Sequence, residues 1–143
     1  MSNAPNVVVY VSHDTGRHIS PYGLKTVNTP AAERVAAEGV VFERCFCTAP
    51  QCSPSRAGLF TGRYPHSNGV MGLTHAEFRW DLSDPKVHAR EHFAKLGYAT
   101  CLVGIAHEAR EPANLGWDFY GPEHRARLAP GVSRKPSNTP GAS

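Results

Sequence analysis

The feature that most constrains this sequence is a turn into a helix across residues 51–62, which read QCSPSRAGLFTG. Pro54 suits the start of a helix, because its missing N–H is not needed there and its fixed φ is already helical. Ser53 is predicted as the N-cap residue and Gly62 as the stop. Cys52 is therefore expected at a helix N-terminus, where unpaired N–H groups and the helix dipole favour an anion. A nucleophile placed there would face an anionic substrate.

The segments around this motif predict alternating strands and helices. NVVVYVS at residues 6–12 is a continuous β-branched run, typical of a strand buried on both faces of a sheet. Further strands are predicted at residues 40–46 and 98–103, and helices are predicted to begin at Thr29-Pro30 and Asp84-Pro85. This order predicts an α/β fold in which helices flank a mainly parallel sheet. From residue 121 onward Pro, Gly, Ser and Arg dominate, so residues 121–143 are predicted to be a poorly ordered tail.

The composition excludes several classes of function. The chain has 143 residues, of which 41% are apolar and 19% charged, as in an ordinary globular domain. The net charge of +3 comes without a Lys/Arg cluster, so no nucleic-acid partner is expected. No apolar run is long enough to span a membrane and no signal peptide is visible. The expectation is therefore a protein without a membrane partner, cytoplasmic by default.

Four cysteines need an interpretation. Cys45, Cys47 and Cys52 are spaced C-x-C-x4-C, which is compatible with a metal site, but no second pair of Cys or His follows at zinc-like spacing. Cys45, Cys47 and Cys101 are interpreted as small buried hydrophobic residues. Cys52 differs from them because a polar, Pro-containing helix start is a poor place to bury an inert thiol. Cys52 is the functional candidate.

The motif that follows Cys52 resembles the defining sequence of the type I sulfatases. The matching residues are Cys52, Ser53, Pro54, Ser55, Arg56, Leu59, Thr61, Gly62 and Arg63. The resemblance covers roughly residues 6–120 and implies the N-terminal part of a sulfatase domain, with an alkaline-phosphatase-like α/β fold. PHSNG at residues 65–69 and MGL at residues 71–73 are similar to the branch that includes heparan N-sulfatases.

The resemblance implies a modified residue and a metal. Cys52 would be oxidised to formylglycine by a formylglycine-generating enzyme, and its hydrated form would contribute to a site for Ca²⁺ or another divalent cation. Asp14 matches the second of two adjacent aspartates that bind calcium in the family, and His13 stands where the first would be. Calcium prefers oxygen ligands, so His13 either binds a softer ion or leaves the site one ligand short. A turn or capping aspartate is the alternative for Asp14.

Two further residues receive catalytic roles from the resemblance. Arg56 lies one helical turn after Cys52 and would hold the sulfate oxygens, with a surface arginine as the alternative. His107 matches the histidine of the family's Gly-Lys-x-His motif, which touches the formylglycine hydroxyls. Ile105 replaces the lysine of that motif. The sulfate would then lack one cation unless Arg110 or a residue outside this chain substitutes.

These observations lead to three hypotheses. The first is a sulfuric ester hydrolase that cleaves a sulfate ester or sulfamate, of a sugar, through formylglycine at position 52. The second is a truncated, non-catalytic sulfatase fragment, because the family's later metal ligands, lysine and histidine are absent from the 143 residues. The third keeps catalysis but changes the substrate to a phosphate or phosphonate ester. On any of them, the 143-residue chain by itself is expected to have little activity.

Overall fold

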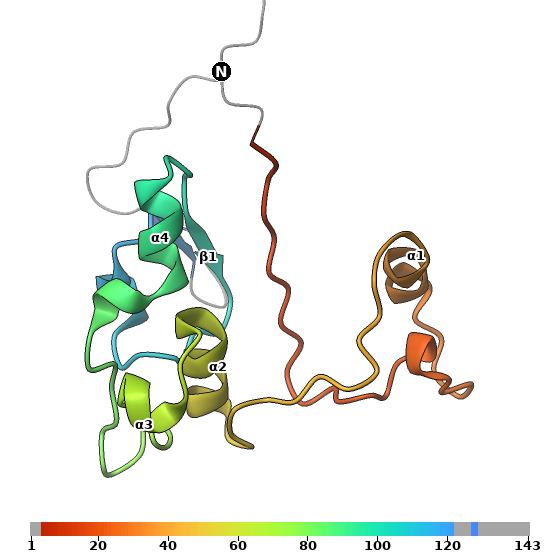
Figure 1. The fold of residues 1–143 in the computed structure, drawn as a ribbon, viewed down its shortest axis with the longest axis horizontal. Helices are drawn as coiled ribbons and strands as arrows, with labels where there is room; N and C mark the ends of the chain where they lie inside the picture. The colour runs from red at the N-terminus through yellow and green to blue at the C-terminus, as the bar shows by residue number, and fades with distance from the viewer. Residues whose placement is uncertain (1–3, 122–126, 129–143) are drawn as a thin grey trace, which may run out of the picture. The chain divides into compact units, whose positions relative to one another are not determined.

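The structure, a computed structural model, describes residues 4–121 and 127–128 of the 143-residue chain. The chain divides into two compact units, residues 1–45 and residues 46–143. The secondary-structure elements of each unit are drawn in Figure 1. Within the described residues, no helix has both the length and the apolar character needed to cross a membrane.

The first unit is built from the 3-10 turn η1, Ser20–Tyr22, and helix α1, Pro30–Glu38. α1 begins after Thr29, as predicted, with Pro30 in its first turn. The Thr29 side chain does not cap the helix. Its Oγ1 instead accepts a hydrogen bond from the backbone N–H of Ser20 at 3.0 Å. This bond fastens η1 to the start of α1.

Two predicted strands do not form, and both predictions are wrong. Residues 6–12 are drawn without a strand arrow in Figure 1, and Val8 and Tyr10 are 86% and 89% exposed. Residues 40–46 are also without strand structure, with Phe42 exposed. A β-strand satisfies its backbone N–H and C=O groups through a neighbouring strand. Within the described part of the first unit, no strand is present to pair with either segment.

The second unit carries helices and a small sheet. Its helical elements are α2 (Cys52–Thr61), α3 (Pro65–Asn68), η2 (Pro85–Val87), α4 (Ala89–Lys95) and η3 (Pro112–Leu115). Its strands are β1 (Cys101–Val103), β2 (Phe119–Gly121) and β3 (Arg127–Leu128), in the order β1-β2-β3. β1 and β2 are parallel, whereas β2 and β3 are antiparallel. The predicted α/β class is confirmed, but in place of a mainly parallel sheet the structure has one parallel and one antiparallel pair.

Several predicted boundaries shift in this unit. β1 is only the second half of the strand predicted at residues 98–103. The helix predicted to begin at Asp84-Pro85 forms as two pieces, because the extended backbone of His88 separates η2 from α4. Asp84 does cap η2, accepting a hydrogen bond from the Lys86 N–H at 2.9 Å. Of the predicted tail at residues 121–143, Gly121 ends β2 and residues 127–128 form β3, while residues 122–126 and 129–143 lie outside the described residues.

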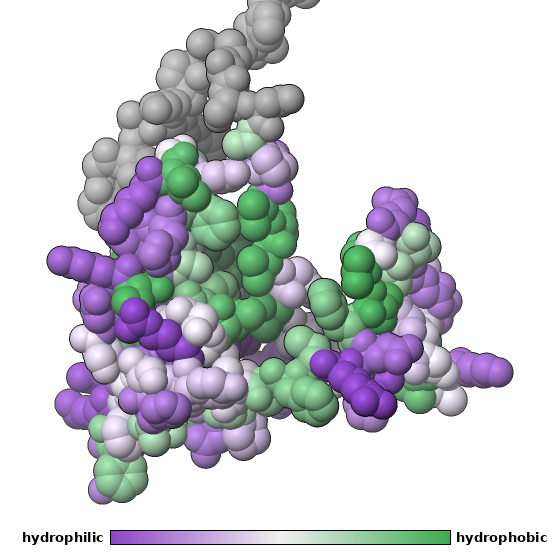
Figure 2. All heavy atoms as spheres, viewed as in Figure 1, coloured by the Kyte–Doolittle hydropathy of each residue, from purple (hydrophilic) through white to green (hydrophobic). Residues whose placement is uncertain are grey.

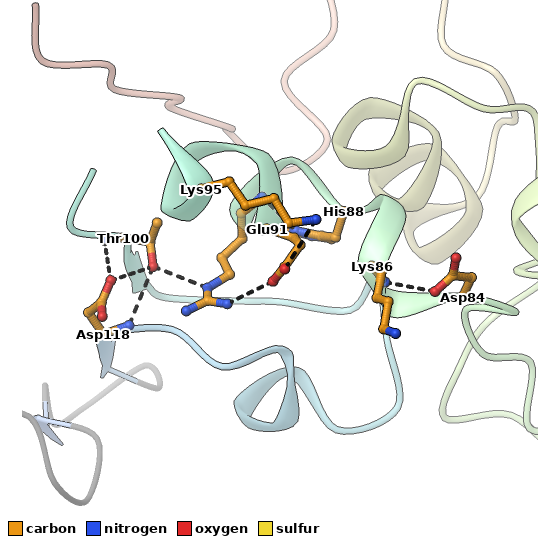
Figure 3. A network of polar contacts seen from close by, with 8 residues as sticks. Asp84, Lys86, His88, Glu91, Lys95, Thr100 and Asp118 are labelled. Carbon is orange, nitrogen blue, oxygen red and sulfur yellow. Dashed lines mark hydrogen bonds and ion pairs between the residues drawn. The ribbon is translucent and has the colours of Figure 1, made fainter. Parts of the chain in front are cut away.

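A polar cluster joins the parallel strands to α4 (Figure 3). Asp118 Oδ2 accepts hydrogen bonds from the Thr100 N–H at 2.7 Å and from Thr100 Oγ1 at 2.9 Å. These bonds lower the pKa of Asp118. Arg90, on α4, donates from Nε to Thr100 Oγ1 at 3.3 Å. The residues that precede β1 and β2 are thereby fixed to each other and to the helix.

The core of the second unit is small. Ala57 on α2 packs with Val70, Leu82 and Ala109, and the partly buried Leu115 lies against them. Other hydrophobic side chains of this unit remain at the surface, and Figure 2 shows them over β1 and α2. Because the buried apolar side chains are few and short, polar contacts carry much of the packing.

The most buried polar residues are His88 and Glu108, each with a side chain only 1% exposed. The His88 ring stacks on Phe60 at 5.3 Å and meets the Trp117 ring edge-on at 5.6 Å. His88 Nδ1 accepts a hydrogen bond from the Arg90 N–H, so Nδ1 carries no proton in this arrangement. Its Nε2 lies 3.9 Å from Glu108 Oε1, which is too long for a hydrogen bond. Within the described residues, His88 Nε2 and both Glu108 carboxyl oxygens are therefore buried without a hydrogen-bond partner.

Burial perturbs the protonation of both groups in the direction of neutrality. Burial, with a smaller contribution from the Arg90 charge, lowers the pKa of His88 to about 4. Burial raises the pKa of Glu108, and the positive charge of Arg56 opposes this only in part. Folding stability from Glu108 is therefore present below its ordinary pKa of 4.5 and is lost as the pH rises through the raised value. Stability from neutral His88 is lost as the pH falls from 6.5 towards about 4.

We predict that Glu108→Gln stabilises the chain at neutral pH and has little effect near pH 4.5. The amide cannot ionise, so the variant avoids the cost of a buried carboxylate that the wild-type chain meets as the pH rises. Urea denaturation of both proteins across this range measures the difference in unfolding free energy. His88 contributes the same pH dependence to both proteins, so the difference isolates Glu108. The exposed Glu77 supplies the control variant Glu77→Gln, and a difference that does not grow with pH would contradict the prediction.

Candidate active site

The candidate nucleophile lies in the first turn of α2. The helix begins at Cys52 with Gln51 as its N-cap, so it starts earlier than the predicted Ser53 cap. Ser53 is instead the second residue of the helix, and its hydroxyl accepts a hydrogen bond from the Thr74 N–H at 3.2 Å. The helix ends at Gly62 in the left-handed conformation, as predicted. Cys52 is therefore in the first turn of the helix, where the backbone N–H groups have no partner within the helix.

Two predicted site residues contact the Cys52 sulfur. Arg56 donates from Nε to Cys52 Sγ at 3.2 Å, across one helical turn. A second donation, from Arg56 Nη1 to the Ile105 carbonyl at 3.1 Å, orients the guanidinium. His107 Nδ1 lies 3.9 Å from Cys52 Sγ. The structure therefore brings together Cys52, Arg56 and His107, the three residues predicted to be catalytic.

A residue that the sequence did not identify holds His107 in place. Thr74 Oγ1 donates to the His107 carbonyl at 3.2 Å, and its N–H donates to Ser53 Oγ. Ser53 and Thr74 are both buried. Thr74 lies in the loop after α3, and nothing in its local sequence distinguishes it from an ordinary loop threonine. The hydrogen bonds of Thr74 to Ser53 and to His107 join residues far apart in sequence, so only the tertiary structure reveals them.

A cavity of about 490 Å³ adjoins His107. Its floor contains the buried residues Thr74, Ala106 and Ala109, and Tyr120 and Pro112 contribute half-buried walls. Its exposed rim contains His75, Arg79, Arg110 and Glu111. The His75 ring lies 5.3 Å from the His107 ring. His75 is exposed.

The two predicted metal ligands of the first unit pair with each other. His13 Nδ1 lies 3.1 Å from Asp14 Oδ2, and the Asp14 side chain is 90% exposed. Asp14 has a left-handed backbone with φ 50°, a conformation that aspartate tolerates in turns. This conformation agrees with the alternative interpretation of Asp14 as a turn residue.

Asp14 and His13 by themselves do not supply the full ligand set of a calcium site. In the part of the chain that the structure describes, no three His, Cys, Asp or Glu residues are grouped closely enough to hold one metal ion. Asp14 supplies carboxylate oxygens, but His13 supplies a nitrogen, and calcium takes six to eight oxygen ligands. No catalytic step is therefore assigned to a metal held by these residues.

The remaining cysteines correct one prediction. Cys45, Cys47 and Cys101 are exposed and not buried, whereas Cys52 is partly buried. Cys45 and Cys47 lie in a segment without regular structure, so no neighbouring element covers them. Cys101 lies on β1, in a short sheet that leaves its side chain at the surface. The spacing C-x-C-x4-C does not correspond to a metal cluster within the described residues.

Comparison with known proteins identifies relatives along most of the chain. A sequence model of the family named Sulfatase matches residues 5–123. An ulvan-active sulfatase of Formosa agariphila is 35% identical over 120 residues, covering 82% of this chain and 23% of that protein. Human N-acetylgalactosamine-6-sulfatase is 33% identical over 117 residues, covering 76% of this chain and 22% of the relative. An N-acetylgalactosamine-6-O-sulfatase of Bacteroides thetaiotaomicron is 33% identical over 121 residues, covering 84% and 24%.

These matches include all the residues around Cys52 that carry the motif, and they confirm the resemblance drawn from it. The chain spans about a quarter of the length of the curated relatives it matches. By the match over residues 5–123 and the identity to these relatives, the chain belongs to the sulfatase family.

Proposed function

We propose that this chain carries the nucleophile of a sulfuric ester hydrolase that cleaves a sulfate ester or sulfamate of a saccharide. The observation that carries the proposal is the convergence on Cys52 Sγ of Arg56 Nε at 3.2 Å and His107 Nδ1 at 3.9 Å. The names of the relatives, which include sulfatases of ulvan and of N-acetylgalactosamine, favour a sugar sulfate. We also propose that the complete sulfatase domain has an alkaline-phosphatase-like fold.

The chemistry requires conversion of Cys52 by a formylglycine-generating enzyme, the partner that the motif implies. Converted and hydrated, residue 52 would supply one hydroxyl for attack on sulfur and a second for release of sulfate, a form of covalent catalysis. The helix N-terminus at this position favours the negative charge of the substrate. The sulfate would then be held by the helix N-terminus at the position where the nucleophile lies.

Arg56 and His107 have separate tasks in this proposal. The Arg56 guanidinium is fixed beside position 52 by the Ile105 carbonyl, so it can hold sulfate oxygens without reorganising. His107 Nδ1 is within reach of an atom in the place of Cys52 Sγ, where it can take or return a proton. Burial raises the pKa of the nearby Glu108, which reduces the tendency of this carboxyl group to oppose the charge of Arg56.

A non-catalytic role is the second candidate, and particular observations favour it. Ile105 places an apolar side chain where the family motif has a lysine. Among the described residues no cluster of metal ligands is present. Hydrolysis of a phosphate or phosphonate ester is the third candidate, and comparing aryl sulfate with aryl phosphate separates it from sulfate hydrolysis.

We expect Cys52 to be converted when the chain is produced together with a formylglycine-generating enzyme. Cys52 is partly exposed at the start of α2, although Ser53 and Pro54 of the motif are buried. Intact-mass measurement, followed by peptide mapping, detects the replacement of the thiol by an aldehyde. Cys47→Ala, an exposed cysteine outside the motif, is the matched control and retains the conversion. An unmodified residue 52 under these conditions would remove the basis of the proposal.

We expect Arg56→Lys to lower kcat for an aryl sulfate by about a hundredfold, the typical worth of one preorganised donor to a developing anion. Lysine cannot contact both position 52 and the Ile105 carbonyl, because it has no planar fork of N–H groups. Hydrolysis of an aryl sulfate is measured for the wild-type protein and for the variant, with an aryl phosphate as the comparison substrate. Arg34→Lys, at an exposed position on α1 and outside the motif, is the control. A loss no larger than that of the control would assign Arg56 to the surface alternative.

A further inference from the structure

The contact between His88 and Glu108 leaves its polar atoms without partners. Among the described residues, His88 Nε2 and both carboxyl oxygens of Glu108 are buried and take part in no hydrogen bond. Trp117, whose ring meets the His88 ring edge-on at 5.6 Å, has a buried Nε1 in the same condition. Buried polar atoms are normally paired, and an unpaired one costs free energy. A small rearrangement that pairs two of these atoms is therefore favoured.

The hydrogen bond at the other ring nitrogen decides which tautomer His88 adopts. His88 Nδ1 accepts from the backbone N–H of Arg90 at 3.1 Å, so this nitrogen carries a lone pair. The proton of the neutral imidazole is then on Nε2. Protonating Nδ1 as well would break the bond from Arg90, so the fold disfavours an imidazolium. The neutral ring therefore has its N–H donor 3.9 Å from a carboxyl oxygen of Glu108.

This separation is about 1 Å longer than a hydrogen bond. Ionisation of Glu108 would close the gap, because a hydrogen bond to a carboxylate is shorter and stronger than one to a neutral carboxyl group. Burial raises the pKa of Glu108, so this ionisation occurs at a higher pH than for an ordinary glutamate. The proton that Glu108 loses passes to solvent, since His88 Nδ1 is occupied by its bond to Arg90.

The charged groups that act on the pair come from two helices. The positive charge of Arg56, on α2, favours the ionised form of Glu108. The positive charge of Arg90, on α4, disfavours an imidazolium at His88. The aromatic rings packed against the imidazole carry no titratable group in the accessible pH range. Both cations therefore favour a neutral His88 beside a carboxylate once Glu108 loses its proton.

A movement at Glu108 reaches the candidate site through the backbone. Glu108 directly follows His107, whose Nδ1 lies 3.9 Å from Cys52 Sγ. The Ile105 carbonyl, on the same loop, accepts a hydrogen bond from Arg56 Nη1 at 3.1 Å. Hydrogen bonds weaken steeply with distance and angle, so a shift of about 1 Å in this loop would alter both contacts.

We propose that His88 and Glu108 are positioning residues for His107, and that ionised Glu108 accepts a hydrogen bond from His88 Nε2 and moves the His107 loop with it. The loop then has one position when Glu108 is protonated and another when it is ionised. The distance between His107 and Cys52 therefore depends on a proton that neither of these two residues carries. The inference goes beyond the proposed function, because it concerns the chain whether or not residue 52 is converted.

The histidine signals in NMR spectra of the unconverted chain test the inference, since no turnover is needed. The chain carries isotope-labelled histidine, and spectra are recorded from about pH 5 to about pH 9. His88 and His107 are assigned by comparison with His88→Asn and His107→Asn. We expect two transitions at the His107 ring, one from its own protonation and one from ionisation of Glu108. The signal of the His88 Nε2 proton should move downfield with the second transition, as its bond to the carboxylate forms.

Two variants separate movement of the loop from a direct effect of charge. Glu108→Gln cannot ionise, so it should lose the second transition at both rings and keep the transition of His107 itself. In His88→Asn, asparagine can still accept from the Arg90 N–H as a capping residue, but it lacks the ring N–H. Glu108 still ionises in this variant, so a purely electrostatic effect on His107 would persist, whereas a positioning effect should be lost. His92→Asn, at an exposed position of α4, is the control and should retain both transitions.

A single transition at His107 in the wild-type chain would overturn the inference, and so would a second transition that survives in Glu108→Gln or in His88→Asn. Thermal unfolding establishes that each variant is folded. If His88→Asn does not fold, the His88 Nε2 proton decides, because a signal that stays in place in the wild-type chain, or moves equally in Glu108→Gln, contradicts the inference. None of these outcomes depends on conversion of residue 52 or on hydrolysis, so they are distinct from a failure of the proposed function.

Discussion

The candidate site depends on the hydrogen bonds that fasten two loops to the first turn of α2. Ser53 Oγ accepts from the Thr74 N–H, and Thr74 Oγ1 donates to the His107 carbonyl. Both side chains are buried, so these bonds form where water competes little. They hold the backbone of His107, whose Nδ1 lies 3.9 Å from the sulfur of Cys52, a residue 55 positions earlier in the chain.

The loop after β1 contacts both the candidate nucleophile and the interior of the second unit, through residues that are close in sequence. The Ile105 carbonyl orients Arg56, and His107 faces the Cys52 sulfur. Glu108 turns into the interior beside His88, where burial raises its pKa. The loop therefore joins the candidate nucleophile to the core, and a change in its path would disturb both. The small apolar core makes this polar fixation important for the site's geometry.

Charge is distributed unevenly around the candidate nucleophile. Ile105 contributes a carbonyl acceptor where the family motif supplies a cation, so Arg56 is the cation in contact with Cys52 among the described residues. Further positive charge lies at the cavity rim, on Arg79 and Arg110. The positive charge described here is therefore divided between the start of α2 and the rim of the cavity.

Features that depend on local chemistry could be predicted from the residues alone. The Cys52–Arg56 pair on one helical turn, the Gly62 stop and the Thr29-Pro30 helix start follow from capping and φ preferences, and the motif identified the family. Only the tertiary structure decided which β-branched segments become strands. Residues 6–12 remain exposed because a strand needs a partner, which local propensity does not specify. The Thr74 bridge and the His88–Glu108 contact likewise join residues far apart in sequence, whose pairing is decided by packing in three dimensions.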